Sequence, residues 1–306
     1  METFDVVVVG GGPAGLSGAV ALARSRRSVL VVDAGEPRNA RAEGAHNLLG
    51  REGIAPQELL ARGREELASY GGQVRRGRAV SAERDGELLV VHLEGGGAVA
   101  GRRLLVTSGL VDELPELPGL RERWGEQVLH CPYCHGWEVR DRRIVVLATS
   151  AMSTHQALLF SQLSDRVVLL THGLAVDDEE RDRMRAAGVA VVDDEAVGLE
   201  GHPLGGVRLR SGALLPADAV VVAPRMRAHS PVLESLGLAA VEHPSGTGEH
   251  YPSELGGTTT LPGVHVAGNV TDPMAQVGAS AAAGMMAGAM LNAQLVETDV
   301  RARLGA

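Results

Sequence analysis

Residues 4–15 read Phe-Asp-Val-Val-Val-Val-Gly-Gly-Gly-Pro-Ala-Gly, an apolar run that passes directly into a glycine-rich turn. The run predicts a buried parallel strand, and the turn leads into a helix. Gly10, Gly12 and Gly15 complete the pattern G-x-G-x-x-G in this strand-to-helix setting. Glycines there let the backbone approach a pyrophosphate, which the helix N-terminus helps to neutralise. The stretch therefore predicts an α/β fold with a dinucleotide-binding domain.

The next apolar run supports this interpretation. Residues 28–32 predict a second strand, which ends at Asp33. An acidic side chain at this place suits a ribose hydroxyl and would repel a 2′-phosphate. A glycine-rich turn without a ligand is the structural alternative, but strand, helix, second strand and acid together argue against it.

Length and composition limit the class of protein. With 306 residues the chain is long enough for two domains, and its net charge of -9 argues against nucleic acid or anionic membranes as partners. All 29 basic residues are arginine, which excludes lysine Schiff-base chemistry. The N-terminus has no signal-peptide pattern, and the longest apolar run, residues 279–291, is too short to span a bilayer. We therefore expect a cytoplasmic protein.

The chain has two cysteines, and both lie in the sequence Cys131-Pro-Tyr-Cys134-His135. A C-x-x-C motif forms a reversible disulfide and lowers the pKa of its thiols. A structural zinc site needs four ligands, and there is no second cysteine pair, so we expect no metal. The motif also matches c-type haem attachment, which requires export. In the cytoplasm an isolated pair is more often catalytic than structural.

A second strand-to-helix turn follows the cysteine motif, but its glycines are missing. Residues 143–148 predict an apolar strand, after which Ala148, Ser150 and Ser153 stand where the first turn has glycine. Side chains at these places would crowd a pyrophosphate. The acidic run 177–180 would also repel the 2′-phosphate of NADPH, and its structural role is the solvated start of a helix. We expect a degenerate NADPH site.

The remaining pattern indicates a helix, a hairpin, two crossings between domains and a helix of small residues that packs tightly. The first helix is predicted at residues 56–70 and the hairpin at 88–93 with 98–106. The crossings between domains are predicted at 114–119 and 244–248, and the small-residue helix at 276–291.

These motifs are followed by residues 262–269, which read P-G-V-H-V-A-G-N, and by Gln276. Their order, with Thr107-Ser108-Gly109 before the C-x-x-C, resembles the low-molecular-weight thioredoxin reductase family of flavoproteins. The resemblance implies an α/β fold with two nucleotide-binding, Rossmann-like domains. The FAD domain would be discontinuous, over residues 1–114 and 242–306. A pyridine-nucleotide-like domain that carries the C-x-x-C would be inserted at residues 115–241. The resemblance also implies a homodimer.

The residues that this family uses to contact FAD carry over one by one. Asn269 stands where the family has Asp beside the ribityl chain, and an amide can still hydrogen-bond a hydroxyl. The other contacts implied are Gly10, Gly12, Pro13, Ala14, Gly15, Asp33, Asn47, Val80, Gly109, Gly268, Gln276 and Val277.

His135 stands where the reductases carry Asp, and H-C-P-Y-C-H-G-W-E resembles the dithiol oxidase branch of the family. That branch, known from gliotoxin- and holomycin-type biosynthesis, closes disulfides in small natural products and uses oxygen instead of NADPH. The resemblance implies that Cys131 meets a small-molecule dithiol and Cys134 faces the flavin. Electrons would pass through FAD to oxygen and give hydrogen peroxide. His135 is the preferred acid and base, with His130 in reserve.

Two other functions stay open at this point. A disulfide reductase would take electrons from NADPH or ferredoxin, and the missing glycines at 148–153 weigh against NADPH but leave ferredoxin open. A flavoprotein without catalysis is the other alternative. The intact cysteine pair argues against this alternative, because a protein without activity has no need to keep its two thiols together.

Overall fold

The computed structural model describes residues 1–305, and the chain divides into two compact units. The first unit contains residues Met1–Ala40 and Ile54–Val111 and the chain from Met226 onward. The second contains Arg41–Gly53 and Asp112–Arg225. Each unit has a sheet with parallel strands and has helices, so the α/β fold with two Rossmann-like domains is confirmed.

The units depart from the predicted domain boundaries of 114/115 and 241/242 in two ways. Residues 41–53 group with the second unit, and the chain returns to the first unit at Met226 rather than at residue 242. The early return has a physical cause, because Val232 and Leu233 are buried in the core of the first unit. The pattern from 226 to 241 contains no long apolar run that would have signalled this burial.

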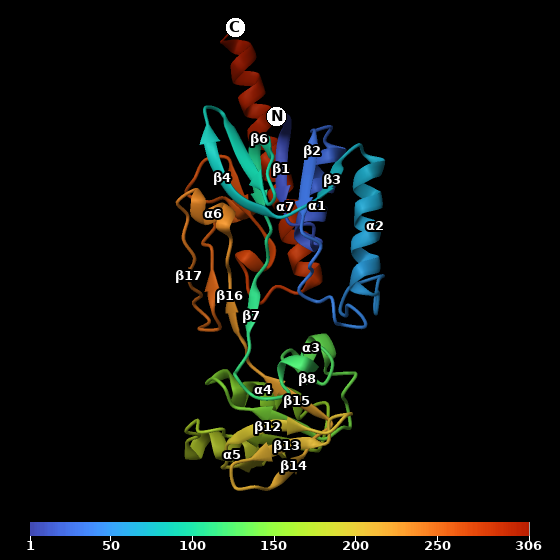
Figure 1. Ribbon diagram of the computed structural model, residues 1–306, viewed down its shortest axis with the longest axis vertical. Coiled ribbons are helices and arrows are strands. Elements are labelled where there is room, and N and C mark those ends of the chain that lie inside the picture. The colour runs from blue at the N-terminus through green and yellow to red at the C-terminus, as the bar shows by residue number, and fades with distance from the viewer. Residues whose placement is uncertain (306) are drawn as a thin grey trace. The chain divides into compact units, whose positions relative to one another are not determined.

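The first unit is built on one mixed sheet (Figure 1). Its strand order is β3-β2-β1-β6-β5-β4, with β19 also paired to β6. β1 runs parallel to β2 and β6, while β4, β5 and β6 are antiparallel, as the predicted hairpin requires. The strands are β1 Glu2–Val9, β2 Val29–Asp33, β3 Gln73–Arg76, β4 Ala79–Asp85, β5 Leu88–Leu93, β6 Ala98–Val106 and β19 Val264–Val266.

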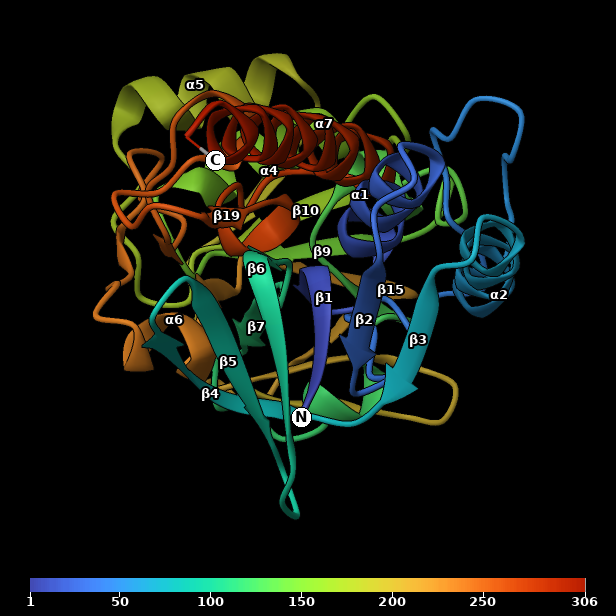
Figure 2. The ribbon, with the colours of Figure 1, turned by 90° about the horizontal axis from the view of Figure 1, so that it is seen from above.

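Both faces of this sheet are covered, which explains the unbroken apolar run in β1. Val6 and Val8 face α1 and α7, and Val7 and Val9 pack in a second core on the other face with α6. Figure 2 shows α1 and α7 on the same side of the sheet. The helices of this unit are α1 Pro13–Arg24, α2 Pro56–Ser69, α6 Pro231–Ser235 and α7 Val277–Leu304.

The close approach of α1 to α7 depends on glycine. A Cβ atom on Gly284 would lie 1.9 Å from the Ala14 carbonyl oxygen, and one on Gly288 would lie 2.5 Å from the Gly18 oxygen. The prediction that the small-residue helix packs tightly is therefore confirmed. Within residues 1–305, no helix combines the length and the apolar character that crossing a membrane requires.

The second unit holds a parallel sheet of strand order β11-β10-β9-β15-β8 and a separate antiparallel sheet, β12-β13-β14. Its helices are α3 Pro132–His135, α4 Met152–Phe160 and α5 Asp178–Ala186. Its strands are β8 Val128–Leu129, β9 Ile144–Leu147, β10 Val167–Leu170, β11 Ala190–Val192, β12 Ala196–Glu200, β13 Gly206–Leu209, β14 Leu214–Pro216 and β15 Ala219–Val222. The remaining short elements of the chain are β7 Val111–Glu113, η1 Arg121–Arg123, β16 Arg225–Arg227, β17 Val241–Glu242, β18 Glu249–His250, η2 Leu255–Gly257 and η3 Gly268–Val270.

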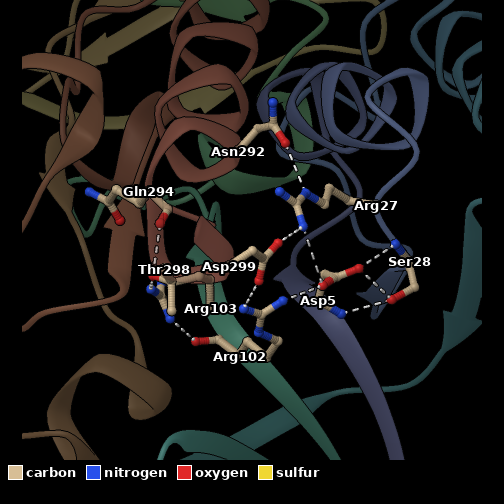
Figure 3. A network of polar contacts seen from close by, with 9 residues as sticks. All are labelled: Asp5, Arg27, Ser28, Arg102, Arg103, Asn292, Gln294, Thr298 and Asp299. Atoms are coloured by element: carbon tan, nitrogen blue, oxygen red, sulfur yellow. Dashed lines mark hydrogen bonds and ion pairs between the residues drawn. The ribbon is translucent and has the colours of Figure 1, made fainter. Parts of the chain in front are cut away.

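A network of charged side chains fastens α7 to the sheet of the first unit (Figure 3). Asp299 of α7 accepts hydrogen bonds from Arg27 at 2.7 Å and from Arg102 of β6 at 2.5 Å. Arg102 also donates to Asp5 of β1 at 3.0 Å, and Arg27 donates to Asn292 of α7 at 2.9 Å. The four charged side chains are only 14–31% exposed, so solvent screens them less than it screens surface pairs.

Removing the carboxylate of Asp299 should destabilise the protein in a pH-dependent way. Hydrogen bonds from Arg27 and Arg102 lower the pKa of Asp299 from 3.8 to about 2. Since the folded pKa lies below the unfolded one, the stabilisation is complete above about pH 4 and is lost as the pH falls toward 2. We expect Asp299→Asn to lower the melting temperature by a few degrees at neutral pH, with the difference from wild type narrowing below about pH 4.

Thermal unfolding followed by circular dichroism over a pH series measures this effect. Glu58→Gln is the control, since it removes the carboxylate of an exposed pair with Arg62 and should change the melting temperature little. A melting-temperature difference for Asp299→Asn that stays constant down to pH 2 would contradict the prediction.

Candidate functional site

The cysteine motif lies in the second unit, shortly after β8, where it forms the start of the short helix α3. Cys131 is the N-cap residue of α3, Pro132 is its first residue, and Cys134 lies one turn further on. The Cys134 N–H donates to the Cys131 carbonyl oxygen at 3.3 Å, and both residues are half-buried. The two thiols therefore belong to a single helical turn, an arrangement that suits reversible disulfide formation.

His135, the last residue of α3, has the surroundings of a base. Its Nε2 is buried and has no hydrogen-bond partner within the described chain. Burial lowers the pKa of His135 below the ordinary 6.5, the carboxylates of Glu138 and Glu43 oppose this shift, and His46 adds to it. The ring is therefore neutral at neutral pH, as a proton acceptor must be.

His130, the predicted reserve, has a different environment. Its ring lies 5.6 Å from the Trp124 ring, and its backbone carbonyl accepts a hydrogen bond from Gln156 of α4 at 2.8 Å. These contacts support a packing role for His130.

Residues 41–53 reach the motif through polar side chains. Asn47 Nδ2 donates to the carbonyl oxygen of Tyr133, between the two cysteines, at 2.7 Å. His46 Nδ1 lies 2.7 Å from Glu52 Oε1, and its Nε2 lies 3.5 Å from Glu138 Oε1. The structure thus joins a loop of the N-terminal part of the chain to the redox motif.

Sequence reasoning missed His46, Glu52 and Glu138 as site residues. Glu138 was visible as the end of the H-C-P-Y-C-H-G-W-E string, but no residue pattern links it to position 46. Asn47 was predicted to contact FAD by resemblance. The structure shows its amide bonded to Tyr133, and its contact with the cofactor stays a prediction.

The second strand-to-helix turn binds its own backbone. Ser153 Oγ accepts hydrogen bonds from the N–H groups of Thr149 at 3.1 Å and Ser150 at 3.3 Å. Ser150 Oγ accepts from the Met152 N–H at 3.2 Å. In a nucleotide-binding turn such N–H groups point at phosphate oxygens. Here hydroxyl groups already satisfy them.

The acidic run near this turn caps a helix. Asp177 is the N-cap of α5, and its Oδ1 accepts from the Glu180 N–H at 2.8 Å. The predicted structural role of the run, the solvated start of a helix, is therefore confirmed. Arg181, the first arginine of α5, lies 2.7 Å from Asp193. The Arg181 charge is thus paired with a carboxylate of the protein, whereas an arginine that binds a 2′-phosphate needs its guanidinium free for the ligand.

The first strand-to-helix turn, in the first unit, is open by contrast. A Cβ on Gly12 would have no atom within 4 Å, although this residue is the N-cap of α1. A Cβ on Gly10 would lie 2.4 Å from the Thr107 oxygen, and one on Gly15 would lie 1.9 Å from the Gly10 oxygen. Gly10 and Gly15 are therefore needed for packing inside the turn. Gly12 leaves an open space before the helix, and this space fits a phosphate group.

Asp33 ends β2 next to this turn and accepts a hydrogen bond from the Gly11 N–H at 3.0 Å. An open space at a helix N-terminus with a carboxylate at the end of the neighbouring strand fits the adenosine diphosphate half of FAD. The residues of the first unit therefore fit the cofactor that the resemblance implies.

Asn269 has a structural reason to differ from the family's Asp. Its Nδ2 donates to the carbonyl oxygens of Asp272 at 3.0 Å and Ala275 at 2.9 Å, in the loop that leads into α7. A carboxylate cannot donate to these oxygens. The amide orders the loop, and the predicted hydrogen bond from Asn269 to a ribityl hydroxyl stays a prediction.

The other predicted FAD contacts also belong to the first unit, apart from Asn47. Gly109 and Gly268 have positive φ angles of 75° and 78°. Pro13 and Ala14 start α1, Gln276 is the N-cap of α7 with Val277 as its first residue, and Val80 lies on β4. The structure therefore gathers these residues in one unit and Cys131, Cys134, His135 and His130 in the other.

Comparisons with solved structures agree with this architecture. The crystal structure of HlmI is 42% identical with a TM-score of 0.92, over 99% of this chain and 95% of that chain. The oxidoreductase from Agrobacterium tumefaciens is 35% identical with a TM-score of 0.91, over 97% of this chain and 99% of that chain.

Curated relatives carry the name thioredoxin reductase. The protein sirT of Leptosphaeria maculans is 28% identical over 98% of this chain and 97% of its own length. The protein tcpT of Claviceps purpurea is 34% identical over 178 residues, which are 55% of this chain and 56% of that protein. The chain thus spans about half the length of tcpT in this match.

Residues 4–288 match the family described as pyridine nucleotide-disulphide oxidoreductase. This range includes the open turn, the cysteine motif and the start of α7. The resemblance to thioredoxin reductase-like flavoproteins is confirmed by these matches. The chain belongs to the pyridine nucleotide-disulphide oxidoreductase family.

Proposed function

We propose that the protein is an FAD-dependent dithiol oxidase. It converts a small-molecule dithiol to an intramolecular disulfide and passes the electrons through FAD to oxygen, which becomes hydrogen peroxide. The observation that carries this proposal is the contrast between an intact cysteine motif and a second nucleotide turn closed by Ser150 and Ser153.

The difference between the intact cysteine motif and the closed second turn bears on the direction of electron flow. A reductase of this family takes electrons at its pyridine-nucleotide site and delivers them at the cysteines. In this chain the N–H groups at Thr149, Ser150 and Met152 are engaged by hydroxyls, so the turn offers little to a pyrophosphate. The cysteine pair is then the better place for electrons to enter.

Thiol–disulfide exchange at Cys131 accounts for the first half of the reaction. One substrate thiol gives its proton to His135, and its sulfur attacks Cys131 Sγ of the enzyme disulfide, which releases Cys134 as a thiolate. The second substrate thiol attacks the mixed disulfide, and Cys131 leaves with a proton. The product is a cyclic disulfide, and two electrons remain on the cysteine pair.

FAD bound by the first unit supplies the acceptor for these two electrons, and oxygen receives them with two protons as hydrogen peroxide. The second unit contributes the proton carrier. His135 is neutral when the substrate arrives because burial lowers its pKa. It can therefore take the thiol proton near neutral pH.

Two exposed aromatic residues lie within and just after the cysteine motif. Tyr133 is 60% exposed and Trp137 is 64% exposed, in a chain with seven aromatic residues. The Arg140 guanidinium lies 4.2 Å from the centre of the Trp137 ring. Exposed apolar rings beside a thiol pair support an organic small molecule as the substrate.

A second candidate function is a disulfide reductase that takes electrons from NADPH or ferredoxin. The curated names of sirT and tcpT, both thioredoxin reductases, favour it. A flavoprotein without activity is the third candidate. The reactions with NADPH, with ferredoxin and with dithiols separate the three.

The purified protein should contain FAD rather than FMN, because the open turn at Gly12 is suited to the pyrophosphate of a dinucleotide. Gly12→Val fills the open space and should remove most of the flavin absorbance while leaving the fold intact. Gly77→Val is the matched control, since a Cβ at Gly77 also has no neighbour within 4 Å. Mass analysis of the released cofactor decides its identity, and FMN would contradict the assignment of the site.

Anaerobic stopped-flow mixing tests the direction of electron flow. A small dithiol such as dithiothreitol should bleach the flavin, whereas NADPH and reduced ferredoxin should leave the oxidised spectrum unchanged. On admission of air, one hydrogen peroxide should form for each dithiol oxidised. Rapid bleaching by NADPH, with none by any dithiol, would exclude the oxidase. No bleaching by any of the three donors would favour the inactive flavoprotein.

The two cysteines should give different spectra when replaced singly. Cys131→Ser should leave a Cys134 thiolate beside the oxidised flavin and produce a broad long-wavelength band. Cys134→Ser should lack that band and should still react with thiols through Cys131. If only the Cys134→Ser protein shows the band, the two roles are reversed.

A further inference from the structure

The segment 41–53 is anchored to the redox motif by side chains, although it lies far from the motif in the sequence. Asn47 Nδ2 holds the Tyr133 carbonyl oxygen at 2.7 Å. Arg41 donates to the Arg121 carbonyl oxygen at 3.3 Å, just before β8. The start of the segment and its middle are therefore tied to the rest of the second unit, and His46 lies directly before Asn47.

His46 lies between two carboxylates. Its Nδ1 is 2.7 Å from Glu52 Oε1, and Glu52 is itself fixed because its other oxygen accepts from the Asn47 N–H at 2.9 Å. Its Nε2 is 3.5 Å from Glu138 Oε1. The ring of His46 therefore bridges Glu52, which belongs to the same segment, and Glu138, which follows the cysteine motif.

His135 is the group on which these charges act. Glu138 and Glu43 favour its protonated form, and His46 disfavours it. Helix α4 packs against α3, and its one titratable side chain, His155, is exposed to solvent. No acceptor on the described chain satisfies the buried Nε2 of His135, so its protonation state is left to burial and to these neighbours.

We propose that His46 and Glu138 are positioning residues that set the charge on His135 from opposite directions. His46 keeps the ring neutral until a substrate thiol arrives, and Glu138 stabilises the imidazolium once the thiol proton has been transferred. The segment 41–53 is then a functional part of the dithiol site. This inference rests on the proposed dithiol oxidation for its role in catalysis, but the electrostatic arrangement is testable without turnover.

The two substitutions should shift the titration of His135 in opposite directions. Glu138→Gln removes a charge that favours the imidazolium and should lower the titration midpoint of His135 by about half a pH unit. His46→Gln removes the opposing charge and frees Glu138, so the midpoint should rise by about the same amount. A merely structural role for either residue predicts no such pair of opposite shifts.

Titration of the holoprotein with ¹⁵N-labelled histidine by NMR measures these midpoints directly. The His135→Gln protein identifies the His135 signals. Glu179→Gln on α5 and His155→Gln on α4 are matched controls, because both side chains are exposed and should leave the His135 midpoint unchanged. Shifts of the same sign in Glu138→Gln and His46→Gln, or no shift in either, would overturn the inference.

The pH profile of anaerobic flavin bleaching by dithiothreitol gives the second readout. Its lower limb should move with the NMR midpoint, downward in Glu138→Gln and upward in His46→Gln. NMR shifts without any bleaching by dithiols would refute the proposed oxidase and leave the charge arrangement standing. If both variants bleach with the same pH profile as the wild type, the proposed role of His46 and Glu138 is refuted.

Discussion

The close approach of α1 to α7 and to its own turn is the constraint on which the first unit depends. A Cβ on Gly284 would lie 1.9 Å from the Ala14 oxygen, and one on Gly15 would lie 1.9 Å from the Gly10 oxygen. Contacts this short leave no room for a side chain, so the start of α1 can have one position only. That position leaves the space at Gly12 open at the carboxyl end of β1. The position of the open space thus follows from backbone packing, and Asp33 holds the turn through the Gly11 N–H.

The chain contains the same strand-to-helix topology twice and uses it in two chemical ways. At the first turn, Gly12 leaves open space before the helix, and no side chain caps the start of α1. At the second, Ser153 accepts hydrogen bonds from the N–H groups of Thr149 and Ser150. A hydroxyl supplies the hydrogen-bond acceptor that a phosphate oxygen would otherwise provide, so the turn keeps its fold without a ligand. A few residues at the start of a helix thus decide whether the N–H groups of such a turn are engaged within the protein.

Features of the fold and the site could be predicted from the sequence where the residues that form them lie close together in the chain. The open turn, Asp33 and the hairpin were predicted, because their signals lie within a few residues of one another. The return to the first unit at Met226 was not predicted, since it depends on Val232 and Leu233 reaching a distant core. The pairing of His46 with Glu138 was also missed, because a salt bridge between remote loops leaves no periodic pattern.

The amino-acid composition leaves few side chains other than histidine that can transfer protons near neutral pH. All 29 basic side chains are arginine, whose charge does not change in the accessible pH range, and the chain has 11 histidines. Proton transfer near neutral pH therefore falls to histidine and to the two thiols. His46 and His135 lie in the same unit as the cysteine pair, and His46 acts electrostatically on His135. A neutral imidazole accepts a proton, and the buried, unpartnered Nε2 of His135 has the surroundings for that task.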